Sequence, residues 1–323
     1  MAETPLADAA RDLIENRAVM LTRMGEDGAI EVRDATMPAP HDDGIVIRVE
    51  AASVNPVDWK IRDGAAPFLD EDDLPAPIGR DCAGTIALLG PAAHNMLSIG
   101  QRVMAHVGGF DRGGQARFVR VDATEFTAIP DSVSTIDAGA VGLIGTTAWQ
   151  GLFDHGRLEA GQSVLIHGGA GGVGHLAVQL ARIKGATVYA TCSGKDVAFV
   201  ESLGAKMAID YEAQDFEDVV SEMDLVFDLI GGAVQERSLA VIRDGGTLIT
   251  TIAESDTVEA PPGIRVESYM ARADNGVLAA ILDHMKDATL RVEVGKTFPL
   301  DAAQDAYVHN REGHDRGKTV LLT

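Results

Sequence analysis

A glycine-rich stretch after a short apolar run places the strongest constraint on how this chain of 323 residues folds. Residues 163–182 read SVLIHGGAGGVGHLAVQLAR, so that an apolar run is followed by glycines and then by apolar residues at helical spacing. This order predicts a buried parallel strand, a tight turn and a helix. Gly169, Gly171 and Gly174 match the G-x-G-x-x-G pattern of dinucleotide-binding turns in that context.

Each of the three glycines has a physical role in such a turn. Gly169 permits the tight turn, Gly171 lets the backbone approach a pyrophosphate, and Gly174 lets the helix pack closely on the strand. The helix N-terminus offers free N–H groups and a positive dipole end to the phosphates. An ordinary glycine-rich loop is the alternative. The residues expected to bind the cofactor here are Gly169, Ala170, Gly171, Gly172, Val173 and Gly174.

Two sequence patterns divide the remainder of the chain. Strand-like and helix-like segments alternate from residue 163 to 286, which predicts a doubly wound parallel sheet. The preceding part is rich in short strand patterns and prolines, and helices are hard to place there. These patterns predict an α/β fold with a β-rich domain (18–135 and 290–323) and a nucleotide-binding domain (136–289). They also predict an N-terminal extension (1–17), in which apolar residues at helical spacing lie within residues 6–14.

The formal net charge of −22 argues against nucleic acids and anionic membrane surfaces as partners, because their phosphates would be repelled. No apolar run is long enough to span a bilayer. The first residues lack the basic start and apolar centre of a signal peptide. The two cysteines, Cys82 and Cys192, are too few for a disulfide framework. These features predict a cytoplasmic protein.

Several separated stretches resemble one family and occur in its order. They are AASVNPVDWKIRDG (51–64), PIGRDCAGTI (77–86), GTTAWQGLF (145–153), HGGAGGVG (167–174), LGAKMAIDY (203–211), FDLIGG (227–232) and RGKTVLL (316–322). The chain is similar to the medium-chain dehydrogenases/reductases, and within them to the zinc-free quinone oxidoreductases related to zeta-crystallin. This resemblance implies a GroES-like catalytic domain, a Rossmann domain, an active site in the cleft between them, and a homodimer.

The resemblance also bears on zinc. Asn55 and Arg80 stand where zinc-dependent relatives carry a cysteine and a histidine ligand, and arginine cannot ligate a metal. The short segment 104–114 has no cysteine for a structural zinc. We therefore expect no metal. Asp58, Asp81 and Cys82 remain an alternative set, because a catalytic zinc needs three nitrogen, sulfur or carboxylate ligands.

The end of the second strand of the nucleotide-binding domain predicts NADPH. NAD-binding domains place an acidic side chain there for the ribose 2′-OH. In this chain the strand ends in CSGK (192–195), with no carboxylate before Asp196. Ser193 and Lys195 supply the hydroxyl and the cation that suit a 2′-phosphate. The resemblance gives both residues this role and adds Tyr211 near the adenine; a solvated lysine is the alternative for Lys195.

Asn55 and Thr147 are the candidate catalytic residues, and both are also expected to bind the cofactor. The Asn55 amide is suited to hold the substrate oxygen or the nicotinamide ribose. The resemblance places Asn55 beside the nicotinamide and matches Thr147 to a threonine that approaches the cofactor in relatives. Lys318, in the tail, is expected to reach the cofactor in the cleft. The alternatives are an Asn-Pro turn for Asn55 and a helix-start hydroxyl for Thr147.

The expected activity is a zinc-independent hydride transfer from NADPH to a quinone or an α,β-unsaturated carbonyl. Enoyl-thioester reductases of the same superfamily carry a tyrosine proton donor, whereas the first half of this chain has no tyrosine. Quinones and reactive enones suit such a site, since solvent can protonate their products. Two other readings stay open: a non-catalytic NADPH-binding sensor or crystallin-like structural protein, and an alcohol or aldehyde dehydrogenase. The last is disfavoured because no metal would acidify the hydroxyl.

Overall fold

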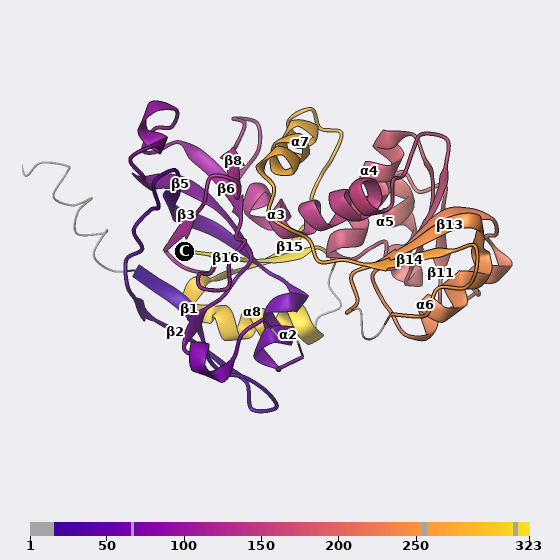
Figure 1. Ribbon diagram of the computed structural model, residues 1–323, viewed down its shortest axis with the longest axis horizontal. Helices are drawn as coiled ribbons and strands as arrows, with labels where there is room; N and C mark the ends of the chain where they lie inside the picture. The colour runs from indigo at the N-terminus through magenta and orange to yellow at the C-terminus, as the bar shows by residue number, and fades with distance from the viewer. Residues whose placement is uncertain (1–15, 66–67, 254–256, 313–315) are drawn as a thin grey trace, which may run out of the picture. The chain divides into compact units, whose positions relative to one another are not determined.

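The computed structural model describes residues 16–65, 68–253, 257–312 and 316–323 (Figure 1). The helical stripe expected at residues 6–14 lies outside these ranges. The described chain divides into two compact units. The first consists of the described part of Met1–Leu143 with Ala273–Lys286 and Glu293–Thr323, and the second of Ile144–Arg272 with Asp287–Val292.

The first unit is built on two β-sheets. A sheet in the order β2-β1-β4 lies beside a larger one in the order β15-β16-β3-β5-β6-β8, and β7 also pairs with β3. Its strands are β1 (Asn16–Arg23), β2 (Ala29–Ala35), β3 (Ile45–Val54), β4 (Ala76–Pro77), β5 (Asp81–Leu89), β6 (Arg102–His106), β7 (Phe118–Val121), β8 (Phe126–Ala128), β15 (Val294–Pro299) and β16 (Lys318–Leu322). Its helices are α2 (Pro56–Arg62), α7 (Asn275–Lys286), α8 (Ala303–Glu312) and the first part of α3 (Thr135–Trp149).

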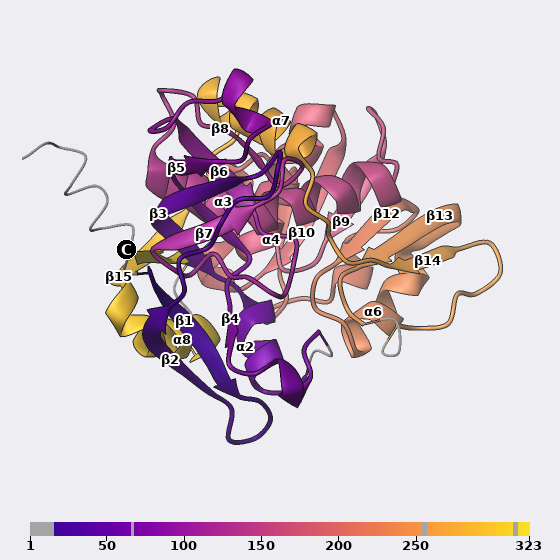
Figure 2. The same ribbon diagram turned by 60° about the vertical axis from the view of Figure 1, so that its left-hand side comes forward.

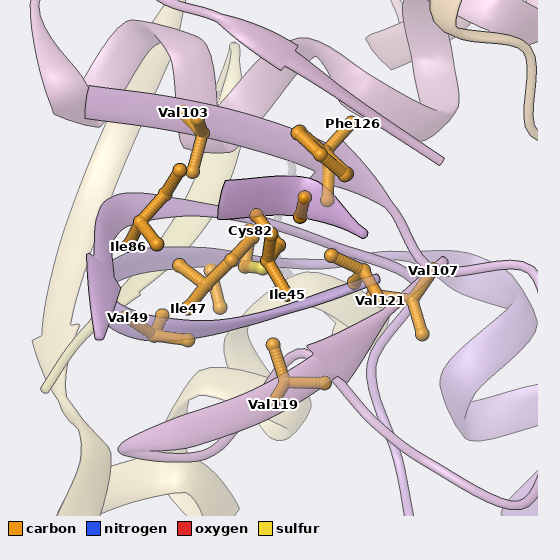
Figure 3. Packing of buried hydrophobic residues seen from close by; sticks show 13 residues of the cluster. Ile45, Ile47, Val49, Cys82, Ile86, Val103, Val107, Val119, Val121 and Phe126 are labelled. Carbon is orange, nitrogen blue, oxygen red and sulfur yellow. The ribbon is translucent and has the colours of Figure 1, made fainter. Parts of the chain in front are cut away.

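Strand β3 is the centre of the larger sheet. It is buried along most of its length, and Ile45, Ile47 and Val49 contribute to a core with Ile86 of β5 and Val103 of β6 (Figure 3). Burying one such side chain contributes about 1.5–3 kcal/mol. The C-terminal strand β16 runs antiparallel to β3. The tail of the chain is therefore fixed beside the end of β3, where α2 begins.

The second unit is a parallel sheet with helical crossovers. Its strand order is β11-β10-β9-β12-β13-β14, which is the order of a Rossmann domain and confirms the expected α/β fold. The strands are β9 (Ser163–Ile166), β10 (Thr187–Cys192), β11 (Met207–Asp210), β12 (Met223–Asp228), β13 (Ile242–Thr250) and β14 (Arg265–Ser268). The helices are α4 (Gly172–Lys184), α5 (Val197–Ser202), α6 (Ala233–Ser238) and the π-helix η3 (Gln150–His155).

Three helices differ from the sequence-based expectation. Helix α2 is short and begins with Pro56 in its first turn, so its sequence resembles a turn. Helix α8 packs on β2, β15 and β16 (Figure 2). Its buried face is narrow, so the helical spacing of its few apolar residues is hard to recognise among the polar ones. Helix α7 was expected in the nucleotide-binding domain, but it packs on β6 and β8, and Asn275 Nδ2 donates to the Ala123 carbonyl over 3.0 Å. None of the helices in the described ranges is both long and apolar enough to cross a bilayer.

Candidate functional site

Polar side chains meet where three strands of the first unit begin or end. Strand β3 is antiparallel to both β5 and β16, so its end lies beside the starts of the other two. This arrangement brings Asn55, just after β3, together with Asp81 at the start of β5 and Lys318 at the start of β16. All three are buried, with at most 4% of the surface of each exposed. The structure thus joins two of the predicted site residues, Asn55 and Lys318.

Hydrogen bonds fix the orientation of the Asn55 amide. Lys318 Nζ donates to Asn55 Oδ1 over 2.5 Å and to the Val54 carbonyl over 3.1 Å. Asn55 Nδ2 donates to Ser53 Oγ over 3.0 Å and to Asp81 Oδ1 over 3.1 Å. The two donor hydrogens of the amide are therefore engaged inside the first unit. Burial lowers the pKa of Lys318, while Asp81 and Asp58 favour its charged form.

Asp58 is a buried carboxyl group at the edge of this cluster. Its Oδ2 accepts hydrogen bonds from the Asn55 N–H over 2.8 Å and from Gln115 Nε2 over 3.1 Å. Its Oδ1 has no partner among the described residues. Burial, with a smaller contribution from Asp81, raises the pKa of Asp58 to about 7. Sequence reasoning considered Asp58 only as a metal ligand, and did not identify Gln115, because no local pattern links positions so far apart.

Arg80 lines the same small cavity as Asp58. Its guanidinium donates to the carbonyls of Gly108, over 2.8 Å, and Gly109, and lies 4.2 Å from the centre of the Phe110 ring. Asp58, Arg80 and Phe110 line a cavity of about 10 Å³, which is close to the smallest volume that can hold one water molecule. Burial lowers the pKa of Arg80, although nearby carboxylates oppose this effect.

The second unit contains the glycine loop. Gly171 is the residue before the first turn of α4, with an extended backbone. A Cβ atom at Gly174 would lie 2.0 Å from the Gly168 carbonyl oxygen, so helix and loop can approach only with glycine there. The first intrahelical bond runs from His175 N to Gly171 O, which leaves the amides of residues 172–174 directed out of the helix end. This geometry suits a pyrophosphate, and the assignment of the loop to the cofactor stays a prediction.

His167 anchors this loop and was not singled out from the sequence. Ser238 Oγ donates to the Val234 carbonyl, so it accepts a hydrogen bond from His167 Nε2 over 2.9 Å. Nδ1 then accepts from Thr191 Oγ1 over 3.1 Å, and Thr191 faces the Gly168 N–H. Burial lowers the pKa of His167 to about 4, which keeps the ring neutral near pH 7. The histidine ties the loop to β10 and α6.

The tip of β10 carries more negative charge than the sequence indicated. Ser193 Oγ donates to Asp196 Oδ2 over 2.8 Å, so this hydroxyl is already paired. The register between β10 and β11 places Asp210 opposite Cys192. A Cβ atom at Gly194 would lie 2.5 Å from Asp210 Oδ2. Two carboxylates therefore flank the region where Lys195 was expected to bind a phosphate.

The remaining predicted residues also belong to the second unit. Tyr211 and Lys195 are exposed, beyond the ends of β11 and β10. Thr147 lies near the C-terminal end of α3 and not at a helix start, and it is largely buried. The hydroxyl of Tyr269 donates to the Thr147 backbone carbonyl over 2.6 Å.

Comparison with known proteins supports a common origin for both units. The model of the alcohol dehydrogenase GroES-like domain matches residues 41–131, and that of the zinc-binding dehydrogenases matches residues 203–321. An NADPH-dependent alkenal/one oxidoreductase of Arabidopsis thaliana chloroplasts is 32% identical over 88% of this chain and 73% of its own length.

Solved structures agree with these matches. The quinone oxidoreductase of Coxiella burnetii has a TM-score of 0.86 at 30% identity and covers 96% of this chain and 99% of its own. A mycobacterial protein solved in complex with NADPH has a TM-score of 0.83 at 27% identity, covering 95% of this chain and 100% of its own.

Proposed function

Because this chain belongs to the medium-chain dehydrogenase/reductase superfamily, we propose that it reduces quinones or α,β-unsaturated carbonyls with NADPH and without a catalytic zinc. The observation that carries the proposal is the Lys318–Asn55 pair, a buried cation held 2.5 Å from the amide oxygen. Such a pair is suited to stabilise negative charge on an acceptor oxygen. The names of the similar proteins, an alkenal/one and a quinone oxidoreductase, support the same substrate classes.

The donor set at this position does not fit a zinc ion. Asn55 already faces an ammonium group, and a second cation at its oxygen would be repelled. The Arg80 guanidinium cannot ligate and is bonded to two backbone carbonyls. Within the described ranges, no group of three or more His, Cys, Asp or Glu side chains is placed to hold a metal. Although one matching family model is named for zinc-binding dehydrogenases, the residues at this position do not form a zinc site that fits that name.

The glycine loop fits a nicotinamide dinucleotide phosphate. The close approach of loop and helix that Gly174 permits leaves the first amides of α4 open for the pyrophosphate. NADPH, when bound, supplies the hydride. Lys318, which Asn55 holds in place, stabilises the negative charge on the acceptor oxygen as the hydride adds, and a proton from solvent completes the reduction. Lys195 provides the cation for the 2′-phosphate.

The cellular setting and the assembly are part of the same proposal. Both Cys82 and Cys192 are buried free thiols, which suits a reducing compartment such as the cytoplasm. Strand β14 is an edge strand that pairs only with β13 in the described chain. Exposed edges of this kind can pair with a second copy, which is consistent with a homodimer.

A turnover screen tests the proposal. The purified chain is supplied with NADPH and quinones, enals, enones or aldehydes, with and without a chelator, and its zinc content is measured. We expect oxidation of NADPH by a quinone or enone that the chelator does not change. NADPH binding without turnover of any acceptor would indicate a sensor instead. One zinc per chain, with activity lost on chelation, would contradict the zinc-free site.

A further inference from the structure

The helix that carries Thr147 changes from an α-helix to a π-helix within one turn after that residue. Helix α3 ends at Trp149, and the chain continues as the π-helix Gln150–His155. In an α-helix the Gly151 N–H would donate to the Thr147 carbonyl. Here the Gly156 N–H donates to the Gly151 carbonyl over 2.9 Å, the wider spacing of a π-helix. Single-turn π segments are rare and are frequent at functional sites.

The hydroxyl of Tyr269 occupies the point where the winding changes. It donates to the Thr147 carbonyl over 2.6 Å, and it lies beside the Gly151 backbone. The hydroxyl thus lies between the two residues whose backbone groups a regular helix would join. A Cβ atom at Gly151 would lie 2.5 Å from this hydroxyl and 2.5 Å from Phe227 Cζ. Glycine at 151 is therefore required for the tyrosine to enter.

Tyr269 is itself fixed to the carboxyl edge of the parallel sheet. It follows β14, and its N–H donates to the Thr250 carbonyl over 3.1 Å at the end of β13. Thr250 Oγ1 donates to Asp228 Oδ2, and that carboxylate also accepts the Gly231 N–H in the turn after β12. Dinucleotides bind at this edge of a Rossmann sheet. Burial raises the pKa of the Tyr269 hydroxyl, so it stays a donor.

A second link runs parallel to the first. The Gln150 side chain donates to the Arg272 carbonyl over 2.9 Å and accepts from the Arg272 N–H over 3.0 Å. The segment after β14 is therefore hydrogen-bonded to this helix at two points, through Tyr269 to Thr147 and through Arg272 to Gln150.

We propose that Tyr269 is a positioning residue, which inserts its hydroxyl between Thr147 and Gly151 and so sets Thr147 against the cofactor-binding edge of the sheet. This inference rests on the proposed function, in which Thr147 contacts the cofactor. Tyr269 acts through Thr147 and touches neither the cofactor nor the acceptor.

Removal of the hydroxyl alone tests the inference. In Tyr269→Phe we expect kcat to fall roughly ten- to hundredfold, because small displacements of a positioned group have effects of that size, while the Kd of NADPH changes less than twofold. Ser268→Ala is the matched control, since it removes the hydroxyl of the preceding residue, which donates to the Ile252 carbonyl. We expect that control to keep wild-type kcat. Loss of kcat together with a matching loss of NADPH affinity and melting temperature would show a structural role and overturn the inference.

A double-mutant cycle with Thr147→Val separates positioning from general destabilisation. If Tyr269 acts through Thr147, Tyr269→Phe has no further effect on kcat in the Thr147→Val background. Additive losses would contradict the inference.

If the wild type oxidises NADPH with none of the acceptors, the proposed function fails, and amide hydrogen exchange then tests the inference by itself. Exchange at residues 147–155 that differs between Tyr269→Phe and Ser268→Ala supports the inference, and equal exchange overturns it.

Discussion

At the scale of single residues, Asp58 has the most unusual ionisation near neutral pH. Its carboxyl group is buried, and one of its oxygens has no partner in the described chain. The pKa of about 7 lies well above the usual value of 3.8, and burial is the main cause. The folded protein therefore holds this proton more tightly than the unfolded chain does. Between about pH 4 and pH 7 the unfolded chain releases the proton first, so the stability of the fold decreases as pH rises through that window.

Asp58→Asn removes this pH dependence. The amide oxygen of asparagine can still accept from the Asn55 N–H and from Gln115 Nε2, and it carries no charge to bury. We expect the variant to melt near the wild-type temperature at about pH 4 and above it at about pH 8, where the gain is at most about 4 kcal/mol. Thermal unfolding across this pH range measures the effect, with the exposed Asp43→Asn as control. A variant that keeps the wild-type pH profile would show that Asp58 ionises normally.

At the scale of elements, two glycines at the start of α4, Gly171 and Gly174, have different roles. Gly171 has a φ of −73°, which any residue adopts, and a Cβ atom there would lie 3.2 Å from the Gly168 oxygen. At Gly174 the same distance would be 2.0 Å, which the packing cannot accept. The first glycine keeps space open in front of the helix, whereas the second permits the helix to pack on the loop.

Alanine at these two positions should therefore have different effects. In Gly171→Ala we expect the melting temperature to stay close to wild type and NADPH binding to weaken tenfold or more, because the methyl group stands where the pyrophosphate approaches. In Gly174→Ala we expect the melting temperature to fall by several degrees as well. Calorimetric titration with NADPH and thermal unfolding check both variants. Unchanged NADPH affinity in Gly171→Ala would place the phosphates elsewhere.

Local patterns account for what the sequence predicted at this scale. Strand β9 lies in the apolar run ahead of the glycines, and all six strands of the second unit lie within residues 163–286, where strand-like and helix-like segments alternate. The site depends on contacts that no local pattern contains. Lys318 meets Asn55 across 263 residues, and Tyr269 meets Thr147 across 122. The sequence suggested both Asn55 and Thr147, but the partners that orient them became visible only in the fold.

At the scale of the whole molecule, charge opposes the proposed cofactor. The net charge of −22 repels a phosphorylated ligand, and Asp196 and Asp210 add local negative charge at the tip of β10. NADPH carries roughly two more negative charges than NADH, from its 2′-phosphate. A preference for NADPH must therefore come from a cation close to that phosphate and not from the field of the molecule. Lys195, exposed just beyond the end of β10, is our candidate.

Two lysine variants distinguish the local cation from the overall charge. Lys195→Ala and Lys206→Ala each remove one positive charge, and Lys206 is an exposed residue beside the Tyr189 ring on the same unit. A charge-assisted contact from Lys195 contributes roughly 1.5–3 kcal/mol, so its loss should weaken NADPH binding about tenfold or more at low ionic strength. We expect NADH binding to change little in either variant, and NADPH binding to change little in Lys206→Ala.

The measurement is the Kd of both cofactors for the three proteins at low and physiological ionic strength. Added salt should reduce the effect of Lys195→Ala, since screening weakens an exposed contact. If both variants weaken NADPH equally, the overall field controls the affinity and Lys195 does not hold the 2′-phosphate.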